Sequence, residues 1–380
     1  MRCTRPPVGR AAAARRTDIA PGRRASAWGG ALLALALFGG CARVEPAPAW
    51  PALSPGEQAV LFTGDVLLGE HIEAHLARHG DGWALERLAP LLAGANAVAV
   101  IGNHEGPLTR RTETGPPNSR WNYGARPETA QALAAAGFTH LSLANNHAMD
   151  RQLAGLHDSR EAIEAAGMVA FGGGRTEAEA RAPLHLVVGG VHMAILPFMK
   201  PWSAYRAWEP KDGVGGVPLL TPGAVGAAVA RARAEGATLV ILFPHWGPEY
   251  KPVDQEQEGM ADEAIAAGVD AIIGHHTHAA QGFERRGTVP VLWSLGNTMF
   301  GTGGRFGEEH GHGLLVRLVI AQGRPDRLEI LVLRVNNNLV GWQPQPAPLR
   351  EAERVLSGLA AQRGADIQIS RGVGVLTWGP

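Results

Sequence analysis

Short apolar runs alternate with amphipathic stretches along most of the 380 residues. A run of five or six apolar residues bounded by Gly, Pro or Asn is typical of a buried strand, and apolar positions three or four apart are typical of a helix. We predict strands at residues 58–62, 97–101, 139–144, 184–188, 191–196, 238–243, 271–273, 289–293, 313–320 and 328–335, and helices at 69–79, 128–136, 159–166, 225–234, 259–267 and 349–361. This alternation predicts an α/β fold with largely parallel sheets, which gather ligands at the carboxyl ends of their strands.

The first forty residues have the order of an export signal. Seven arginines against one aspartate precede the apolar run 31–38 and then Gly39-Gly40-Cys41. That run is shorter than the roughly 20 residues that a membrane-spanning helix needs, and the small residues before Cys41 resemble a lipoprotein cleavage site. A twin-arginine signal at Arg23-Arg24 and an uncleaved membrane anchor are the alternatives. We therefore expect an exported chain, anchored to the membrane through a lipid on Cys41 or released into the periplasm or outside the cell.

The expected organisation is an export signal at residues 1–41, a Pro-rich tether at 42–56, one large domain at 57–345, and a C-terminal helix and extension at 346–380. The chain has 2 Cys, at positions 3 and 41, so no pair remains for a disulfide in the mature part. Without the first forty residues it would carry 28 Lys and Arg against 34 Asp and Glu. A mildly acidic chain is a poor binder of nucleic acid, and we expect no nucleic-acid partner.

Side chains that bind metals or transfer protons follow five of the predicted strands. They are Asp65, Glu105, Asn146 with His147, His245, and His276 with His278. Because the carboxyl ends of parallel strands meet at one edge of a sheet, we expect these side chains to lie together. Carboxylate, amide and imidazole ligands without a thiolate suit Mn, Zn or Fe. The structural alternative is that the Asp and Asn residues cap helices and the histidines are solvated or lie in the core.

Three imidazoles occupy four positions after the strand at 271–273. In an extended turn alternate side chains share one side, so His276 and His278 would reach a metal centre and His275 would point away. A carboxylate such as Glu105 can bridge two ions, and two ions about 4 Å apart can bind both the attacking and the leaving oxygen of an ester.

His147 is not needed as a metal ligand in this arrangement, so it is free to protonate a leaving group. If a helix begins near His147, Asp150 lies three positions on and on the same helix face. Asp150 would then hold the tautomer and the orientation of the imidazole. We predict His147 and Asp150 as the catalytic pair.

Six short motifs, in order along the chain, resemble those of the poly-gamma-glutamate capsule biosynthesis protein CapA family, a branch of the calcineurin-like metallophosphoesterases. The motifs are Gly64-Asp65, Asn103-x-Glu105-Gly106, Asn145-Asn146-His147-x-x-Asp150, His245-Trp246-Gly247-x-Glu249, Gly274-x-His276-x-His278 and Ser294-Leu295-Gly296-Asn297. The resemblance covers about residues 58–340 and implies an α/β four-layer α-β-β-α sandwich with a dinuclear metal site. It gives the ligand role to Asp65, Glu105, Asn146, His245, His276 and His278, and the acid role to His147.

One position departs from the pattern of the wider superfamily, as it does in CapA-like chains, and two depart from the CapA-like pattern itself. Leu67 stands where the wider superfamily has a His, and the nearby His71 is expected to face solvent. Gln152 replaces a Gly, and His104 replaces a Leu. These departures place one metal short of a ligand and affect the loops around the site.

Three functions agree with these observations. The first is a CapA-type envelope protein that acts in the synthesis, export or anchoring of anionic poly-gamma-glutamate, with membrane capsule-synthesis subunits as possible partners. The second is a periplasmic metal-dependent phosphoesterase or nucleotidase with a phosphoester substrate. The third is a non-catalytic subunit that keeps the metal site for structure or docking.

Overall fold

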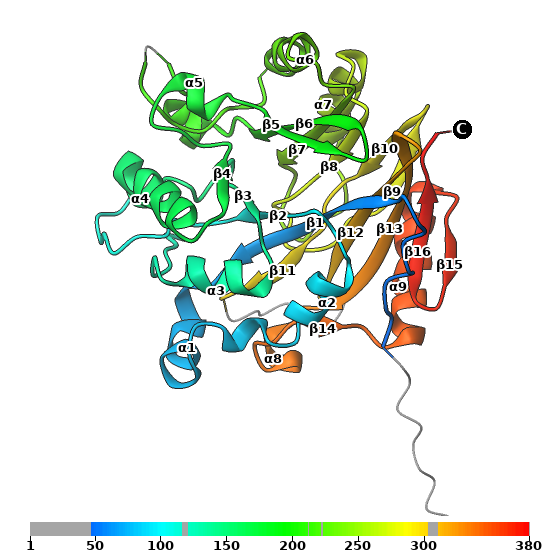
Figure 1. Cartoon of the computed structure of the whole chain (residues 1–380). Helices are drawn as coiled ribbons and strands as arrows, with labels where there is room; N and C mark the ends of the chain where they lie inside the picture. The colour runs from blue at the N-terminus through cyan, green and yellow to red at the C-terminus, as the bar shows by residue number, and fades with distance from the viewer. Residues whose placement is uncertain (1–46, 116–120, 212, 222, 303–310, 380) are drawn as a thin grey trace, which may run out of the picture. The chain divides into compact units, whose positions relative to one another are not determined.

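The computed structural model describes residues 47–115, 121–211, 213–221, 223–302 and 311–379, and its elements are labelled in Figure 1. The described residues form a mixed α/β fold with two β-sheets. The larger sheet has the order β15-β16-β13-β12-β1-β2-β3-β4, with β11 beside β1 and β14 beside β13. Its strands are β1 (Gln58–Leu67), β2 (Ala99–His104), β3 (His140–Ser142), β4 (Val169–Phe171), β11 (Asn297–Phe300), β12 (His312–Ala321), β13 (Arg324–Arg334), β14 (Gln345–Pro346), β15 (Gln368–Ser370) and β16 (Val373–Thr377).

The smaller sheet has six strands in the order β5-β6-β7-β8-β10-β9. They are β5 (Leu184–Val188), β6 (Val191–Met199), β7 (Leu239–His245), β8 (Ala271–Ile273), β9 (Phe283–Arg286) and β10 (Val289–Leu292). In the larger sheet β1 to β4 are parallel, and in the smaller sheet β6, β7, β8 and β10 are parallel. Antiparallel strands lie on both sides of the parallel region in the smaller sheet, and on one side of it in the larger sheet, where the parallel β4 is at the edge. The prediction of parallel strands therefore holds for one continuous region of each sheet, whereas the pairs β1–β12, β5–β6 and β9–β10 are antiparallel.

Three hydrophobic clusters divide the domain into four layers, as the α-β-β-α expectation required. One lies between the larger sheet and a layer of helices, one lies between the two sheets, and one lies between the smaller sheet and a second helical layer. The first helical layer holds α1 (Glu73–His79), α2 (Ala89–Gly94), α3 (Thr129–Ala136) and α4 (Gln152–Ala165), and the second holds α6 (Ala224–Ala234) and α7 (Gln255–Ala266). Both faces of the central strands are thus buried, which explains their continuous apolar runs.

Most predicted elements are present, with shifted ends. β1 runs five residues beyond the predicted strand 58–62, because polar Thr63 and Asp65 are buried within it. α4 begins at Gln152 rather than at residue 159, and residues 145–151 before it form turns. The sequence pattern missed β4, β9, β11, β14, β15 and β16, all of which have five residues or fewer. α9 (Leu349–Arg363) is present near its predicted bounds, and its buried face packs into the cluster between the sheets.

The Pro-rich stretch packs on the domain near its middle, where Pro48 is buried and Trp50 is half-buried. Trp50 Nε1 donates a hydrogen bond to Leu91 O (2.9 Å), and the buried Arg317 donates to Pro51 O (2.6 Å). The predicted signal, including Cys41, and the first residues of the tether lie outside the described residues. Among the described helices, none has the length and apolar character to cross a bilayer.

Candidate metal centre

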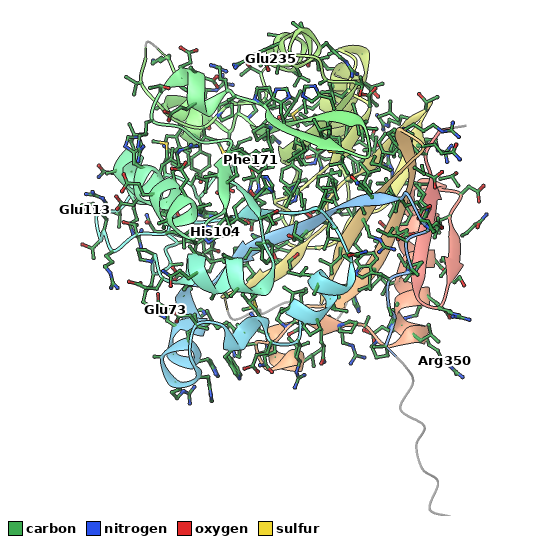
Figure 2. The ribbon with its side chains drawn as sticks, in the orientation of Figure 1. Glu73, His104, Glu113, Phe171, Glu235 and Arg350 are labelled. Atoms are coloured by element: carbon green, nitrogen blue, oxygen red, sulfur yellow. The ribbon has the colours of Figure 1, made fainter. Side chains whose placement is uncertain are left out.

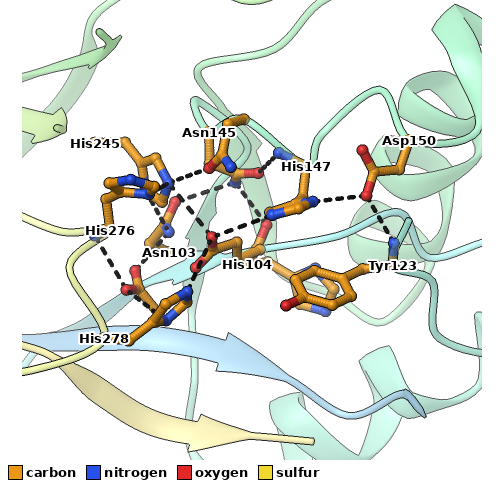
Figure 3. A network of polar contacts seen from close by, with 12 residues as sticks. Asn103, His104, Tyr123, Asn145, His147, Asp150, His245, His276 and His278 are labelled. Carbon is orange, nitrogen blue, oxygen red and sulfur yellow. Dashed lines mark hydrogen bonds and ion pairs between the residues drawn. The ribbon is translucent and has the colours of Figure 1, made fainter. Parts of the chain in front are cut away.

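All six predicted ligands converge at the carboxyl ends of strands from both sheets. Figure 3 shows His245, His276 and His278 close together, with His147 and Asp150 beside them. Asp65 lies in β1 beside Asn103 of β2 and Asn297 of β11, and His245 ends β7. Two glycines of the motifs allow this convergence: a Cβ on Gly64 would lie 1.8 Å from Gly296 O, and a Cβ on Gly274 would lie 2.0 Å from Trp293 O. Only glycine permits such close backbone approach, so the strand ends can meet at one point.

Glu105, His245 and His276 form one group whose ligand atoms lie within 4.8 Å of one another. His245 Nε2 lies 3.0 Å from His276 Nδ1, 3.5 Å from Glu105 Oε1 and 2.6 Å from Asn146 Oδ1. Four atoms that carry lone pairs thus surround one point, and the side chains are almost entirely buried. Such an arrangement suits a divalent cation, with Asn146 Oδ1 as an additional oxygen ligand.

Asp65, Glu105 and His278 form the second group. His278 Nδ1 lies 3.9 Å from Asp65 Oδ2, and its Nε2 lies 3.9 Å from Glu105 Oε1. Glu105 is common to both groups. Both of its carboxylate oxygens are buried and have no hydrogen-bond partner among the residues that the structure describes. Buried polar atoms are rarely left unsatisfied, so these two oxygens point to a ligand between the groups.

Burial is the largest cause of the pKa shifts of four predicted ligands. Burial raises the pKa of Asp65 to about 6 and, with the nearby Asp65, raises the pKa of Glu105 well above its usual range. Burial and the neighbouring imidazoles hold the pKa values of His245 and His276 well below the ordinary range, so both rings are neutral. Neutral imidazoles are the ligand form, and divalent cations would compensate the charge of the carboxylates.

His147 lies beside the two groups without belonging to either. Its Nε2 is 4.0 Å from Glu105 Oε1, and its Nδ1 is 2.7 Å from Asp150 Oδ2. Asp150 Oδ2 also accepts a hydrogen bond from Tyr123 N (2.7 Å), and the Tyr123 ring lies 4.2 Å from the imidazole. The predicted pairing of His147 with Asp150 is therefore present, but the predicted reason is wrong: the two residues lie in turns before α4, not on one helical face.

The loop after β8 directs its three histidines as expected but by a different backbone. His276 and His278 face the ligand groups, whereas His275 packs its ring 4.1 Å from Phe243 and places Nε2 3.1 Å from Thr63 O. The loop is not extended, since φ is +94° at His276 and +56° at His278. These left-handed conformations are uncommon for non-glycine residues. The backbone N–H of His276 donates to Asp65 Oδ2 (3.1 Å), which helps to hold this turn in place.

Several residues that orient the ligands were not among the predicted site residues. Asn103 Nδ2 donates to Asp65 Oδ1 (2.7 Å) and lies 3.2 Å from His245 Nδ1. Asn297 Oδ1 lies 2.9 Å from His278 Nδ1. Both asparagines belong to the sequence motifs, and that membership was the available signal. The ring centroid of Trp202 lies 4.7 Å from that of His276. Trp202 and Tyr123 come from irregular segments that have no local pattern to mark them.

The structure shows the surroundings of the residues that depart from the motif patterns. Leu67 is buried in the cluster under the first helical layer and offers no ligand atom, and His71 is exposed. Gln152 has φ of +59°, a backbone conformation that favours glycine. His104 is buried with Nδ1 2.8 Å from Gly106 O, and burial lowers its pKa to about 4.

Comparison with known proteins agrees with the motifs. The family model described as "Bacterial capsule synthesis protein PGA_cap" matches residues 59–302. The chain is 31% identical over 249 residues to "Capsule biosynthesis protein CapA" of Bacillus anthracis, covering 64% of this chain and 59% of that protein. It is 27% identical over 245 residues to "PGA biosynthesis protein CapA" of Bacillus subtilis (strain 168), covering 64% and 63%.

The matched region thus spans about three fifths of the length of these two relatives. A solved structure, calcineurin-like phosphoesterase YfkN from Bacillus subtilis, is similar with a TM-score of 0.42 and 13% identity, covering 80% of this chain and 96% of that one. The resemblance to the CapA family expected from the motifs is confirmed by the family match over more than half of the residues: the chain belongs to the bacterial capsule synthesis protein PGA_cap family.

Proposed function

We propose that this chain is a cell-envelope protein of poly-gamma-glutamate capsule synthesis, export or anchoring, and that it works as a metal-dependent hydrolase. The names of two relatives support the capsule role, since they refer to capsule or PGA biosynthesis. The predicted export signal supports a place outside the cytoplasm, with a lipid on Cys41 as the anchor. In that place the chain would meet the polymer and the membrane subunits that make it.

The observation that carries the hydrolase proposal is the position of Glu105. Its carboxylate belongs to both ligand groups, and neither oxygen has a hydrogen-bond partner among the described residues. An ionised carboxylate buried without compensation is costly, so evolution of a purely structural core would favour an apolar or hydrogen-bonded side chain here. The arrangement fits two divalent cations that share Glu105 as a bridging ligand.

The remaining ligands divide between the two ions. His245, His276 and the amide oxygen of Asn146 would hold one, and Asp65 and His278 would hold the other. When bound, such ions activate water and stabilise the negative charge that develops on an ester or amide during hydrolysis. Asn103 and Asn297 orient Asp65 and His278 and so fix the ligand geometry.

His147 is the residue best placed to deliver a proton to the leaving group. Its Nδ1 contacts Asp150 and its Nε2 points toward Glu105, so the free nitrogen faces the centre where substrate would bind. Asp150 orients the ring through this contact. A site that only stabilised the fold would not require an imidazole held beside the ligands without being one of them. This observation favours an enzyme over a non-catalytic capsule-assembly subunit.

Two substrate classes agree with this chemistry. One is the gamma-linked amide bond of polyglutamate, and the other is a phosphoester, as in a nucleotidase. The proposal is tested by measuring the metal content of the purified mature protein and its hydrolysis of a panel of phosphoesters and gamma-linked glutamyl peptides. Turnover that requires a divalent metal and is strongest on glutamyl peptides supports the first class. Protein that binds no divalent metal and cleaves neither class would contradict the hydrolase proposal.

A further inference from the structure

A groove of about 610 Å³ runs along α9, apart from the metal centre. Its polar lining includes His312 at the start of β12, Arg334 at the end of β13, and Glu351 and Arg354 on α9. We propose that this groove binds the carboxylates of an extended glutamyl chain and so holds the polymer next to the metal centre. The identity of the bound polymer rests on the proposed function, whereas the groove and its charges are independent of that proposal.

The charges in the groove leave one arginine available for a ligand. Arg334 Nε donates to Glu351 Oε1 (2.7 Å), a second Arg334 nitrogen donates to Oε2, and His312 Nε2 lies 2.9 Å from Oε1. Glu351 is therefore fully engaged, and Arg334 compensates its charge. Arg354 is exposed and has no hydrogen bond or ion pair with any residue that the structure describes. Its guanidinium presents a fork of donors that matches a carboxylate or a phosphate.

The apolar part of the lining distinguishes between these two oxyanions. Leu339 of α8 (Asn337–Val340) and Val355 and Leu359 of α9 supply aliphatic surface beside the arginines. A glutamyl residue carries methylene groups next to its carboxylate, and these would pack against that surface and bury apolar area. A polyphosphate offers no such groups. The combination of a free guanidinium with an aliphatic wall therefore favours a carboxylate on a short aliphatic stem.

One residue of the groove lining is close to a metal ligand in the sequence. Ala280, which lines the groove, lies two residues after His278. Gly296, which precedes Asn297, packs tightly against two residues of the groove lining: a Cβ on Gly296 would lie 2.7 Å from Ala280 N and 3.2 Å from His312 O. Asn297 in turn holds His278. A chain bound along α9 would thus lie beside the part of the protein that positions the second metal group.

The test is binding of a gamma-linked glutamate pentapeptide to the full mature chain by calorimetry, with tripolyphosphate as the comparison ligand. Arg354→Glu reverses the free charge. Gly358→Leu places an aliphatic side chain in the groove, where a Cβ at Gly358 would meet nothing within 4 Å. Since hydrogen bonds to charged groups contribute about 1.5–3 kcal/mol, we expect Arg354→Glu to weaken pentapeptide binding by roughly tenfold to 100-fold. We expect Gly358→Leu to weaken it as well, because the leucine occupies the space that the pentapeptide would take.

Arg350→Glu is the control, because Arg350, labelled in Figure 2, is an exposed arginine of the same helix. It is not one of the residues that line the groove. Arg350→Glu should change affinity by less than about threefold at physiological salt, where exposed charges are screened. His276→Ala should keep pentapeptide binding while it loses metal, which separates failure of the groove from failure of the hydrolase proposal.

Three results would overturn the assignment. They are wild-type affinity for the pentapeptide in both groove variants, an equal loss in the Arg350 control, and tighter binding of tripolyphosphate than of the pentapeptide. A selective loss in the two groove variants would support it.

Discussion

Replacement of His147 by Ala separates an enzyme from a scaffold. The imidazole contacts Asp150 and the Tyr123 ring, and its Nε2 lies 4.0 Å from Glu105 without belonging to either metal group. Removal of the ring should therefore leave both metal groups complete. General acid catalysis is typically worth about 10²- to 10⁴-fold. We expect His147→Ala to lower turnover by that factor while metal content stays at the wild-type level.

Asp150→Asn should give a smaller loss of the same kind, because Asp150 orients the imidazole but transfers no proton to the substrate. The assay is turnover of the best substrate from the ester and peptide panel, with metal content and thermal midpoint measured on the same samples. His71→Ala is the control, since His71 is an exposed histidine outside the site. Wild-type turnover in His147→Ala, or full restoration of surface polymer by it in a deletion strain, would refute the assigned role.

Four further outcomes follow from the structure. Glu105→Gln should abolish the stabilisation that saturating Mn²⁺ gives the wild type, about 2.7 kcal/mol at 100 times the dissociation constant, and an equal rise in thermal midpoint in both proteins would exclude a bridging role. Metal affinity should fall as pH drops through about 6, because burial raises the pKa of Asp65 to about 6 in the metal-free protein and protons then compete with the metal for this carboxylate. A metal affinity, measured by calorimetry, that stays constant between pH 5 and 7 would contradict this. The pKa of Glu351 is lowered to about 2, chiefly by Arg334, so the contribution of Glu351 to the free energy of unfolding is complete above about pH 4.5 and is lost toward pH 2. Glu351→Gln should remove this part of the acid sensitivity of unfolding, which is at most about 3 kcal/mol. Mass spectrometry of the mature N-terminus should find a lipid on Cys41, and an intact arginine-rich start would rule out that anchor.

The sequence predicted the centre of the fold better than its edges. The buried parallel strands contain apolar runs, so β1, β2, β7 and β8 could be located from the pattern of apolar residues along the sequence. Edge strands such as β15 have exposed residues and no such run. Their pairing depends on long-range contacts that local pattern does not encode.

The candidate site was predictable in its ligands and less so in its supports. Strand ends mark Asp65, Glu105 and His245, because metal-binding side chains follow several predicted strands and the carboxyl ends of parallel strands meet at one edge of a sheet. The turn at His276 could not be foreseen, since its left-handed backbone is held by a hydrogen bond to Asp65 from a strand 211 positions earlier. Tyr123 likewise reaches Asp150 from a loop without periodicity.

The central claim is that two divalent ions share Glu105. The most direct test is a crystal structure of the protein loaded with Mn²⁺, with the ions located by anomalous scattering. We predict two peaks, one beside His245 and His276 and one beside Asp65 and His278, both in contact with the Glu105 carboxylate and about 3.5–4 Å apart. A single peak, or two peaks of which only one touches Glu105, would contradict the account.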